Sequence, residues 1–153
     1  MANDYISIAK TDREWVDYLI SGGKDKGNFN PAVVQCQQVA EKYLKGYIDE
    51  YLNFDGVFDK QLKSHNLRLL AGIINEKTGV GIDLRDAKYL GDFYFDARYP
   101  GDNYMLIKDV AIAEECKGIC DDIISKIDSL IESRFKSGTV TEFFGAITKD
   151  DLI

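Results

Sequence analysis

The feature that most constrains the fold is an apolar stripe that begins at Asn30-Pro31 and recurs at steps of three and four residues. Its members are Val33, Cys36, Ala40, Tyr43, Leu44, Tyr47, Ile48 and Tyr51. Such steps put side chains on one face of a helix. Asn30 can cap this helix, and Pro31 suits its first position. We expect the opposite face, with Glu41 and Lys45 at the spacing of an ion pair, to be exposed.

Four further segments with the same period complete a set of about five helices. The first begins at Thr11, with Glu14 at the capping-box position, and ends at Ser21-Gly22-Gly23. The others cover residues 64–77, 83–98 and 108–135. The pattern predicts an all-α fold, an up-and-down bundle of about five helices.

The remainder of the chain adds a short irregular C-terminal tail, residues 136–153, to this prediction. Within it, residues 139–144 form either a strand or a docked arm. No repeat, low-complexity tract or second domain is visible. We therefore expect a single helical domain over residues 1–153, with its helical core at about residues 11–135.

Composition narrows the function classes. With 45% hydrophobic and 29% charged residues, the chain is typical of a globular protein. A net charge of −7 argues against broad non-specific binding of nucleic acid, which needs a surplus of Lys and Arg. No apolar run approaches a membrane span, and the first residues do not form a signal peptide. We expect a cytoplasmic protein.

The motifs of common cofactor sites are missing from the sequence. It has no P-loop, no GxGxxG, no GxSxG and no HExxH pattern. Cys36, Cys116 and Cys120 together with His65 offer the ligand types of a zinc site. All three cysteines fall on apolar helix stripes, however, where a free thiol behaves as a small hydrophobe. We expect no metal and no cofactor.

Two polar clusters are candidates for chemistry. One is the run on the long helix that contains Gln37, Gln38, Glu41, Lys42 and Lys45, which reads either as a solvated face or as a set of ligand contacts. The other is the segment Asp96-Ala97-Arg98-Tyr99-Pro100-Gly101-Asp102-Asn103-Tyr104. An arginine near a helix C-terminus is favoured electrostatically in any case. Flanked by aromatic rings in a rigid turn, it also suits a phosphate or a base.

Three segments in this order resemble the HEPN domain, named for nucleotide binding in higher eukaryotes and prokaryotes. They are Val39-Ala40-Glu41-Lys42-Tyr43-Leu44-Lys45, Ser64-His65-Asn66-Leu67-Arg68-Leu69-Leu70 and Ala97-Arg98-Tyr99-Pro100-Gly101. The resemblance covers about residues 15–134 and implies a helical bundle that commonly forms homodimers. Such proteins bind a nucleotide or a partner, and often accompany a minimal nucleotidyltransferase in a toxin–antitoxin-like system. On this resemblance we expect a ligand groove lined by Arg98, Tyr99, Asn103 and Tyr104, together with Lys42 and Lys45.

One branch of the family implies a different function. Its members are metal-independent ribonucleases that use an arginine followed, after four to six residues, by a histidine. Here Asn103 stands five positions after Arg98, and an amide does not exchange protons near neutral pH. The alternative prediction is a metal-independent endoribonuclease that uses Arg98 with His65, although His65 lies in a stretch that resembles a structural helix start. Whether the chain is an enzyme stays open, and the missing histidine argues against it.

A third alternative is a purely structural, dimeric interaction protein. Nine tyrosines and eight phenylalanines would then supply the dimer interface. Aromatic residues also fill cores, so their number does not separate this alternative from the others.

Overall fold

The computed structural model of the chain describes residues 4–101 and 104–147, with side chains described as far as residue 135. Over these residues the chain forms six α-helices and no strand. They are α1 (Tyr5–Arg13), α2 (Val16–Lys26), α3 (Asn30–Tyr47), α4 (Leu67–Thr78), α5 (Leu84–Asp96) and α6 (Val110–Ile147). Three short helical turns, Ile48–Leu52, Phe54–Gly56 and Gln61–Lys63, connect α3 to α4. The predicted all-α bundle is confirmed.

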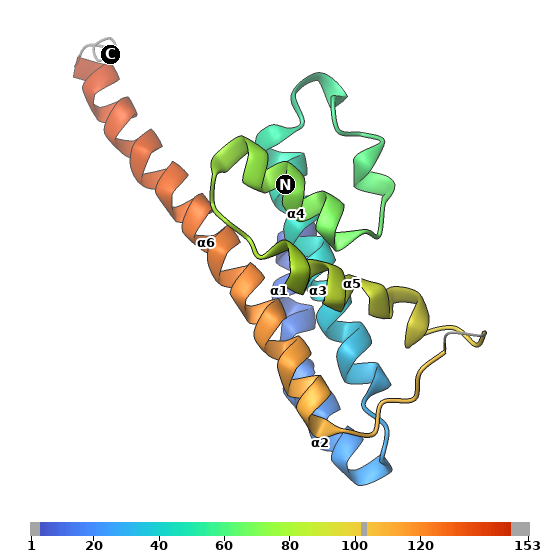
Figure 1. Cartoon of the computed structure of the whole chain (residues 1–153). Helices are drawn as coiled ribbons and strands as arrows, with labels where there is room; N and C mark the ends of the chain where they lie inside the picture. Colours follow the sequence, from blue (N-terminus) through green and yellow to red (C-terminus); the bar gives the residue numbers. More distant parts are fainter. Residues whose placement is uncertain (1–3, 102–103, 148–153) are drawn as a thin grey trace.

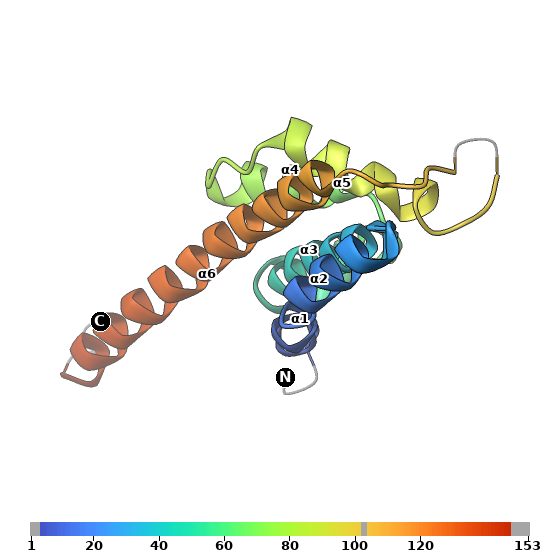
Figure 2. The same ribbon diagram turned by 90° about the horizontal axis from the view of Figure 1, so that it is seen from below.

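Helix α3 lies at the centre of the bundle. It contacts each of the other five α-helices, and α4 and α5 also pack on one another. In Figure 1 the first two helices run along α3, and Figure 2 shows α4 and α5 covering a different side of it. Because helices surround α3, its apolar stripe is buried, including Leu44 and Ile48 at 0% exposure. A central helix with neighbours on several sides has little surface left for solvent.

Local capping explains where α4 and α5 begin. The side chain of Asn66 accepts a hydrogen bond from the Leu69 backbone N–H, and Asp83 accepts from the N–H groups of Arg85 and Asp86. Such side-chain acceptors satisfy N–H groups that have no partner within the helix. The predicted start of α5 at Asp83 is confirmed.

The predicted start of the first helix at Thr11 is wrong. Thr11 lies inside α1, whose N-cap is Asp4. This helix ends at Arg13, and α2 begins at Val16. Asp4 accepts a hydrogen bond from Ser7 N at 2.9 Å, so a cap further upstream starts the helix. Trp15 lies between α1 and α2 and is 56% exposed, so it is not part of the core.

The predicted irregular tail is also wrong as far as residue 147. Helix α6 continues through residues 136–147, including the segment expected to be a strand or an arm, and Figure 1 shows its end extending beyond the other helices. Adding a residue to an existing helix costs far less than starting a new one, so a long helix can continue through residues of modest propensity. Residues 148–153 lie outside the described part.

Burial corrects the interpretation of the polar face of α3. Gln37 is 0% exposed, and Glu41 and Lys45 are each 6% exposed. The spacing of the ion pair was identified correctly, but its expected exposure was wrong because α4 and α5 cover this side of α3. The three cysteines are buried, as expected for small hydrophobes. No helix in the described part of the chain is long and apolar enough to cross a membrane.

Candidate ligand-binding groove

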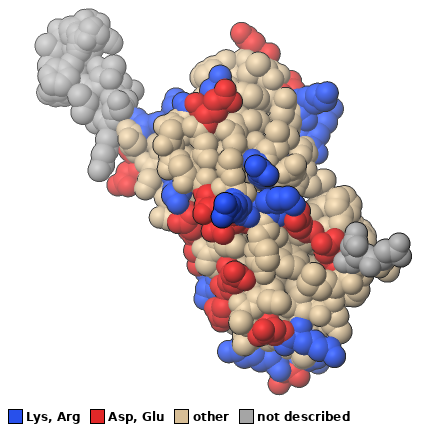
Figure 3. Space-filling view, in the orientation of Figure 1, with Lys and Arg blue, Asp and Glu red and all other residues tan. Residues whose placement is uncertain are grey.

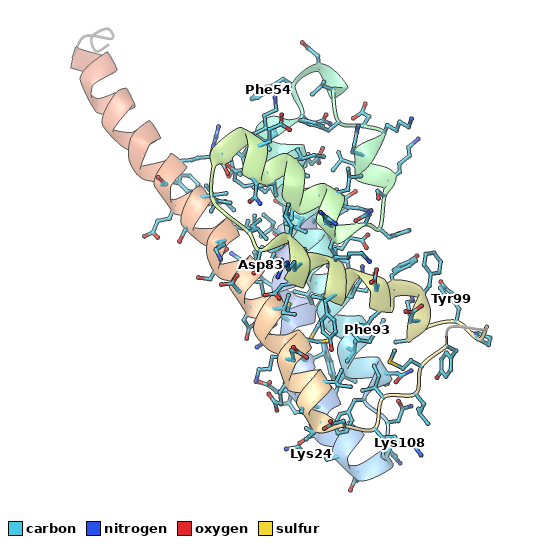
Figure 4. The ribbon with its side chains drawn as sticks, viewed as in Figure 1. Lys24, Phe54, Asp83, Phe93, Tyr99 and Lys108 are labelled. Carbon is cyan, nitrogen blue, oxygen red and sulfur yellow. The ribbon has the colours of Figure 1, made fainter. Side chains whose placement is uncertain are left out.

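An open groove of about 580 Å³ lies between the start of α4 and the second half of α5. In Figure 4, Asp83 marks the start of α5 and Tyr99 the turn after its end. The residues that line the groove are Ser64, His65, Asn66, Leu67, Arg68, Lys88, Gly91, Asp92, Tyr94, Phe95 and Asp96. Figure 3 shows basic and acidic side chains gathered next to one another in the middle of the face that carries α4 and α5.

His65 joins three parts of the fold at this groove. It stands just before the cap of α4, and its Nδ1 lies 3.0 Å from Oε2 of Glu41 on α3. Its Nε2 lies 3.1 Å from the hydroxyl of Tyr94 on α5, and the two rings stack with centroids 4.1 Å apart. The imidazole is thus held on both nitrogens while 44% of its side chain stays exposed.

The Glu41 carboxylate that holds His65 has a complete set of partners. Its Oε2 also accepts from Lys45 Nζ at 2.8 Å, and its Oε1 accepts from Gln37 Nε2 at 3.0 Å. Gln37 in turn accepts from Gln38 Nε2 at 2.6 Å. A polar network therefore extends from the groove into the interior of the bundle, where such groups are stable only when paired.

These partners favour one tautomer of the neutral imidazole of His65. A carboxylate only accepts hydrogen bonds, so Nδ1 carries the hydrogen and donates the hydrogen bond to Glu41. Partial burial is the main cause that raises the pKa of the Tyr94 phenol, which therefore keeps its proton and donates to Nε2. Nε2 is then the acceptor nitrogen, and it faces the Tyr94 hydroxyl.

Arg98 lies beside this group, just after the end of α5. Its guanidinium carbon is 4.6 Å from the centre of the Tyr94 ring and 5.2 Å from that of Tyr99. Tyr99 also contacts Phe95, with ring centroids 5.9 Å apart. Cation–π contacts of this kind hold a guanidinium in place without neutralising it. The structure therefore brings three of the sequence-predicted residues, Arg98, Tyr99 and His65, together around Tyr94.

The other sequence-predicted residues lie elsewhere. Lys42 pairs with Asp12 of α1 and does not line the groove. Lys45 is buried beneath it, in contact with Glu41. The Tyr104 hydroxyl lies 3.2 Å from Nδ2 of Asn30 at the start of α3. Asn103 lies outside the described residues.

The prediction that Asn30 caps α3 is wrong, because Phe29 stands at the cap position and no side-chain hydrogen bond caps this helix. The side chain of Asn30 instead binds the segment that follows α5. Its Nδ2 donates to the carbonyls of Ala97 at 3.1 Å and Met105 at 2.7 Å, and its Oδ1 accepts from Ile107 N at 2.8 Å. The side chain is 4% exposed, so these bonds are shielded from water. They hold the backbone at Ala97, directly before Arg98, and at Met105 and Ile107 after it.

Among the groove residues, Arg68, Phe95 and Asp96 were not named as ligand contacts from the sequence. Arg68 lies in one of the three segments that resemble the family, and Asp96 begins the candidate segment around Arg98, but neither residue was assigned a role. Phe95 lies outside these segments and became a candidate only once the partner of α5 was known. The cysteines lie apart from His65, and the described residues contain no group of three or more metal-binding side chains that could hold an ion.

Comparison with known proteins adds one match. The family model described as HEPN domain matches residues 2–130 of the chain. No curated protein and no solved structure matches the chain.

Proposed function

Because the chain belongs to the HEPN domain family, we propose that it binds a nucleotide, free or as a unit of RNA, in the groove between α4 and α5. The observation that carries this proposal is His65. It is held between Glu41 and Tyr94 at the edge of an open groove, next to two arginines that face solvent.

The arginines supply the phosphate contacts. Arg68 lines the groove, and Arg98 stacks on Tyr94 without a carboxylate partner among the described residues. An unpaired guanidinium matches the geometry of a phosphate, to which it can donate two parallel hydrogen bonds. His65 lines the groove together with Arg68, whereas Arg98 lies beside it against Tyr94.

The test is nucleotide-induced thermal stabilisation of the protein, measured by calorimetry. Wild-type protein gains stability with a short single-stranded RNA, which offers a phosphate to each arginine. Arg68→Ala and Arg98→Ala each lose most of this gain while their helical circular dichroism is unchanged. Arg85→Ala is the matched control, since Arg85 is exposed on α5 but does not line the groove. Absence of stabilisation in the wild type, or loss of helix content in Arg98→Ala, contradicts the proposal.

A second candidate function is metal-independent cleavage of RNA, favoured by the Glu41–His65 hydrogen bond. Nδ1 donates to Glu41, and Nε2 can accept the proton of a ribose 2′-hydroxyl when that hydroxyl replaces the Tyr94 hydroxyl as its hydrogen-bond donor. A neighbouring arginine can stabilise charge on the phosphate. Cleavage of a labelled RNA would then continue in EDTA. It would fall by roughly two to four orders of magnitude in His65→Ala. RNA that stays intact with wild-type protein rules out this candidate.

Family membership also supports a proposal about partners. We propose that the chain forms a homodimer in the cytoplasm and acts with a minimal nucleotidyltransferase as part of a toxin–antitoxin-like pair. The exposed and adjacent rings of Trp15 and Tyr18, 5.9 Å between centroids, supply apolar surface for such a contact. Pull-down from native lysate with mass spectrometry tests the partner, and light scattering tests the dimer. Recovery of no nucleotidyltransferase contradicts the first part, and a monomer contradicts the second.

A further inference from the structure

The two ends of the groove differ in chemistry. His65 stacks on Tyr94, and a Cβ placed on Gly91 would lie 3.3 Å from the Cβ of Leu67. These two contacts set the register of α4 against α5, and they put Arg68 toward the Lys88 end of the groove. Arg68 and Lys88 therefore lie toward one end of the groove. The other end holds an aromatic ring and a carboxylate, and Arg98 lies beside that end, against Tyr94.

The aromatic ring is that of Phe95. It is 63% exposed although it lines the groove, and it meets the Tyr94 ring edge to face at 4.6 Å. An exposed ring supported from the side by a second ring is suited to stacking with a planar base.

The carboxylate is that of Asp96, which follows Phe95 directly. It is half-buried in the groove wall, and its carboxylate oxygens have no hydrogen-bond or ion-pair partner among the described residues. Asp92, one turn earlier on the same helix, is different because it pairs with Lys88 at 3.0 Å. An unpaired carboxylate repels a phosphate-bearing ligand unless the ligand offers it hydrogen-bond donors.

Among the four RNA bases, guanine is the one that presents two adjacent N–H donors, N1–H and N2–H, on one edge. A carboxylate accepts both at once, whereas adenine and cytosine offer a single amino group on that edge. We propose that the groove is selective for guanine. The base stacks on Phe95 with its N1–N2 edge on Asp96, and the phosphate lies toward Arg68. This inference rests on the nucleotide-binding function proposed above.

Calorimetry with a series of nucleoside monophosphates tests it. In the wild type, GMP binds more tightly than AMP, CMP or UMP. IMP, which lacks the N2 amine, binds about tenfold more weakly than GMP because one charge-assisted hydrogen bond is lost. Equal affinity for all bases overturns guanine selectivity while leaving the proposed function in place. Binding of none of these nucleotides overturns both.

Asp96→Asn provides a change of specificity that a misfolded variant does not produce. An amide offers one acceptor and one donor, which match N1–H and O2 of xanthine, so XMP gains affinity and GMP loses it. Asp92→Asn is the matched control, since it changes a paired carboxylate on the same helix, and it retains the preference for GMP. If Asp96→Asn still prefers GMP, Asp96 does not read the base.

Discussion

At Glu41, one carboxylate accepts hydrogen bonds from three side chains. Gln37 and Lys45 approach along α3, and His65 approaches from the start of α4. Both Glu41 and Lys45 are 6% exposed, so each depends on the other for neutralisation. Their pairing is a buried ion pair, in which loss of one partner leaves an uncompensated charge.

We predict that Glu41→Ala lowers the free energy of unfolding by about 3–5 kcal/mol, because the Lys45 ammonium is left buried without a counter-charge. Urea denaturation followed by circular dichroism measures the change. Lys88→Ala is the control, since it breaks an exposed pair of the same spacing and is expected to cost about 0.3–0.5 kcal/mol. Similar small losses in both variants would mean that burial adds nothing to the Glu41–Lys45 pair.

The same residues show how far the site could be predicted from the sequence. The spacing of Glu41 and Lys45 identified their contact, because residues four apart on a helix are neighbours. The pairing of Glu41 with His65 spans 24 residues, and no local pattern encodes it. Arg98 was found from its turn and its aromatic neighbours. Asp96 belonged to the same candidate segment, but the position of α4 was needed to show that it lines the groove.

Contacts between helices restrict which positions accept a larger side chain. Gly46 of α3 faces α1 so closely that a Cβ there would lie 2.5 Å from Cγ1 of Ile6. Gly118 of α6 has nothing within 4 Å of such an atom. Both glycines lie inside helices, where alanine is intrinsically favoured.

We predict opposite effects of the same substitution at these two positions. Gly118→Ala raises the free energy of unfolding by about 0.5–1 kcal/mol because alanine has the higher helix propensity. Gly46→Ala lowers it by about 1–3 kcal/mol because α1 must move away from α3. Thermal and urea denaturation of the two variants measure both changes. Stabilisation by Gly46→Ala would show that α1 does not pack as closely as described.

The interface of α3 and α6 predicts sensitivity to alkali. Burial raises the pKa of the Cys116 thiol from 9.0 to about 12, and that of the Tyr43 phenol from 10.0 to about 12. A pKa raised by folding means that the neutral form is favoured in the fold, so its stabilisation is complete below the unfolded pKa and is lost above it.

We therefore predict that the free energy of unfolding falls as the pH rises from 9 toward 12. Urea denaturation in reducing buffer across this range measures the slope. In Cys116→Ala the decline just above pH 9 becomes shallower, since one of the ionising groups is gone. A free energy of unfolding that is constant over the whole range would contradict the prediction.

The beginning of a helix was predictable where one strong cap stood alone, as at Asp83. The proline at position 31 placed the start of α3 correctly, but the predicted cap was wrong because Phe29, and not Asn30, stands at the cap position. The first helix was placed wrongly because Thr11, with Glu14 three residues later, matches the capping box. Asp4 has Ser7 at that position and does not match it, yet its side chain accepts the hydrogen bond from Ser7 N that caps α1. The end of α6 was missed because helix propagation does not require the apolar period on which the prediction was based.

For the whole molecule, a net charge of −7 means that phosphate binding depends on a few local cations. If Arg68 and Arg98 contact two phosphates of a short single-stranded RNA, log K falls against log salt concentration with a slope of about −1.4. Arg98→Ala reduces the slope to about −0.7, which titrations at several salt concentrations measure. A slope of about −3 or steeper would mean that a wider cationic surface is involved.

The position of His65 has a practical consequence, because it is the single histidine of the sequence. Its ring signals in a nitrogen-15 magnetic resonance spectrum would need no assignment and would come from the groove alone. They distinguish a proton on Nδ1 from one on Nε2, so the spectrum reads out directly whether the contact with Tyr94 persists when a ligand enters. The chain thus carries its own reporter at the place where its function is proposed, provided that it is purified without a histidine tag.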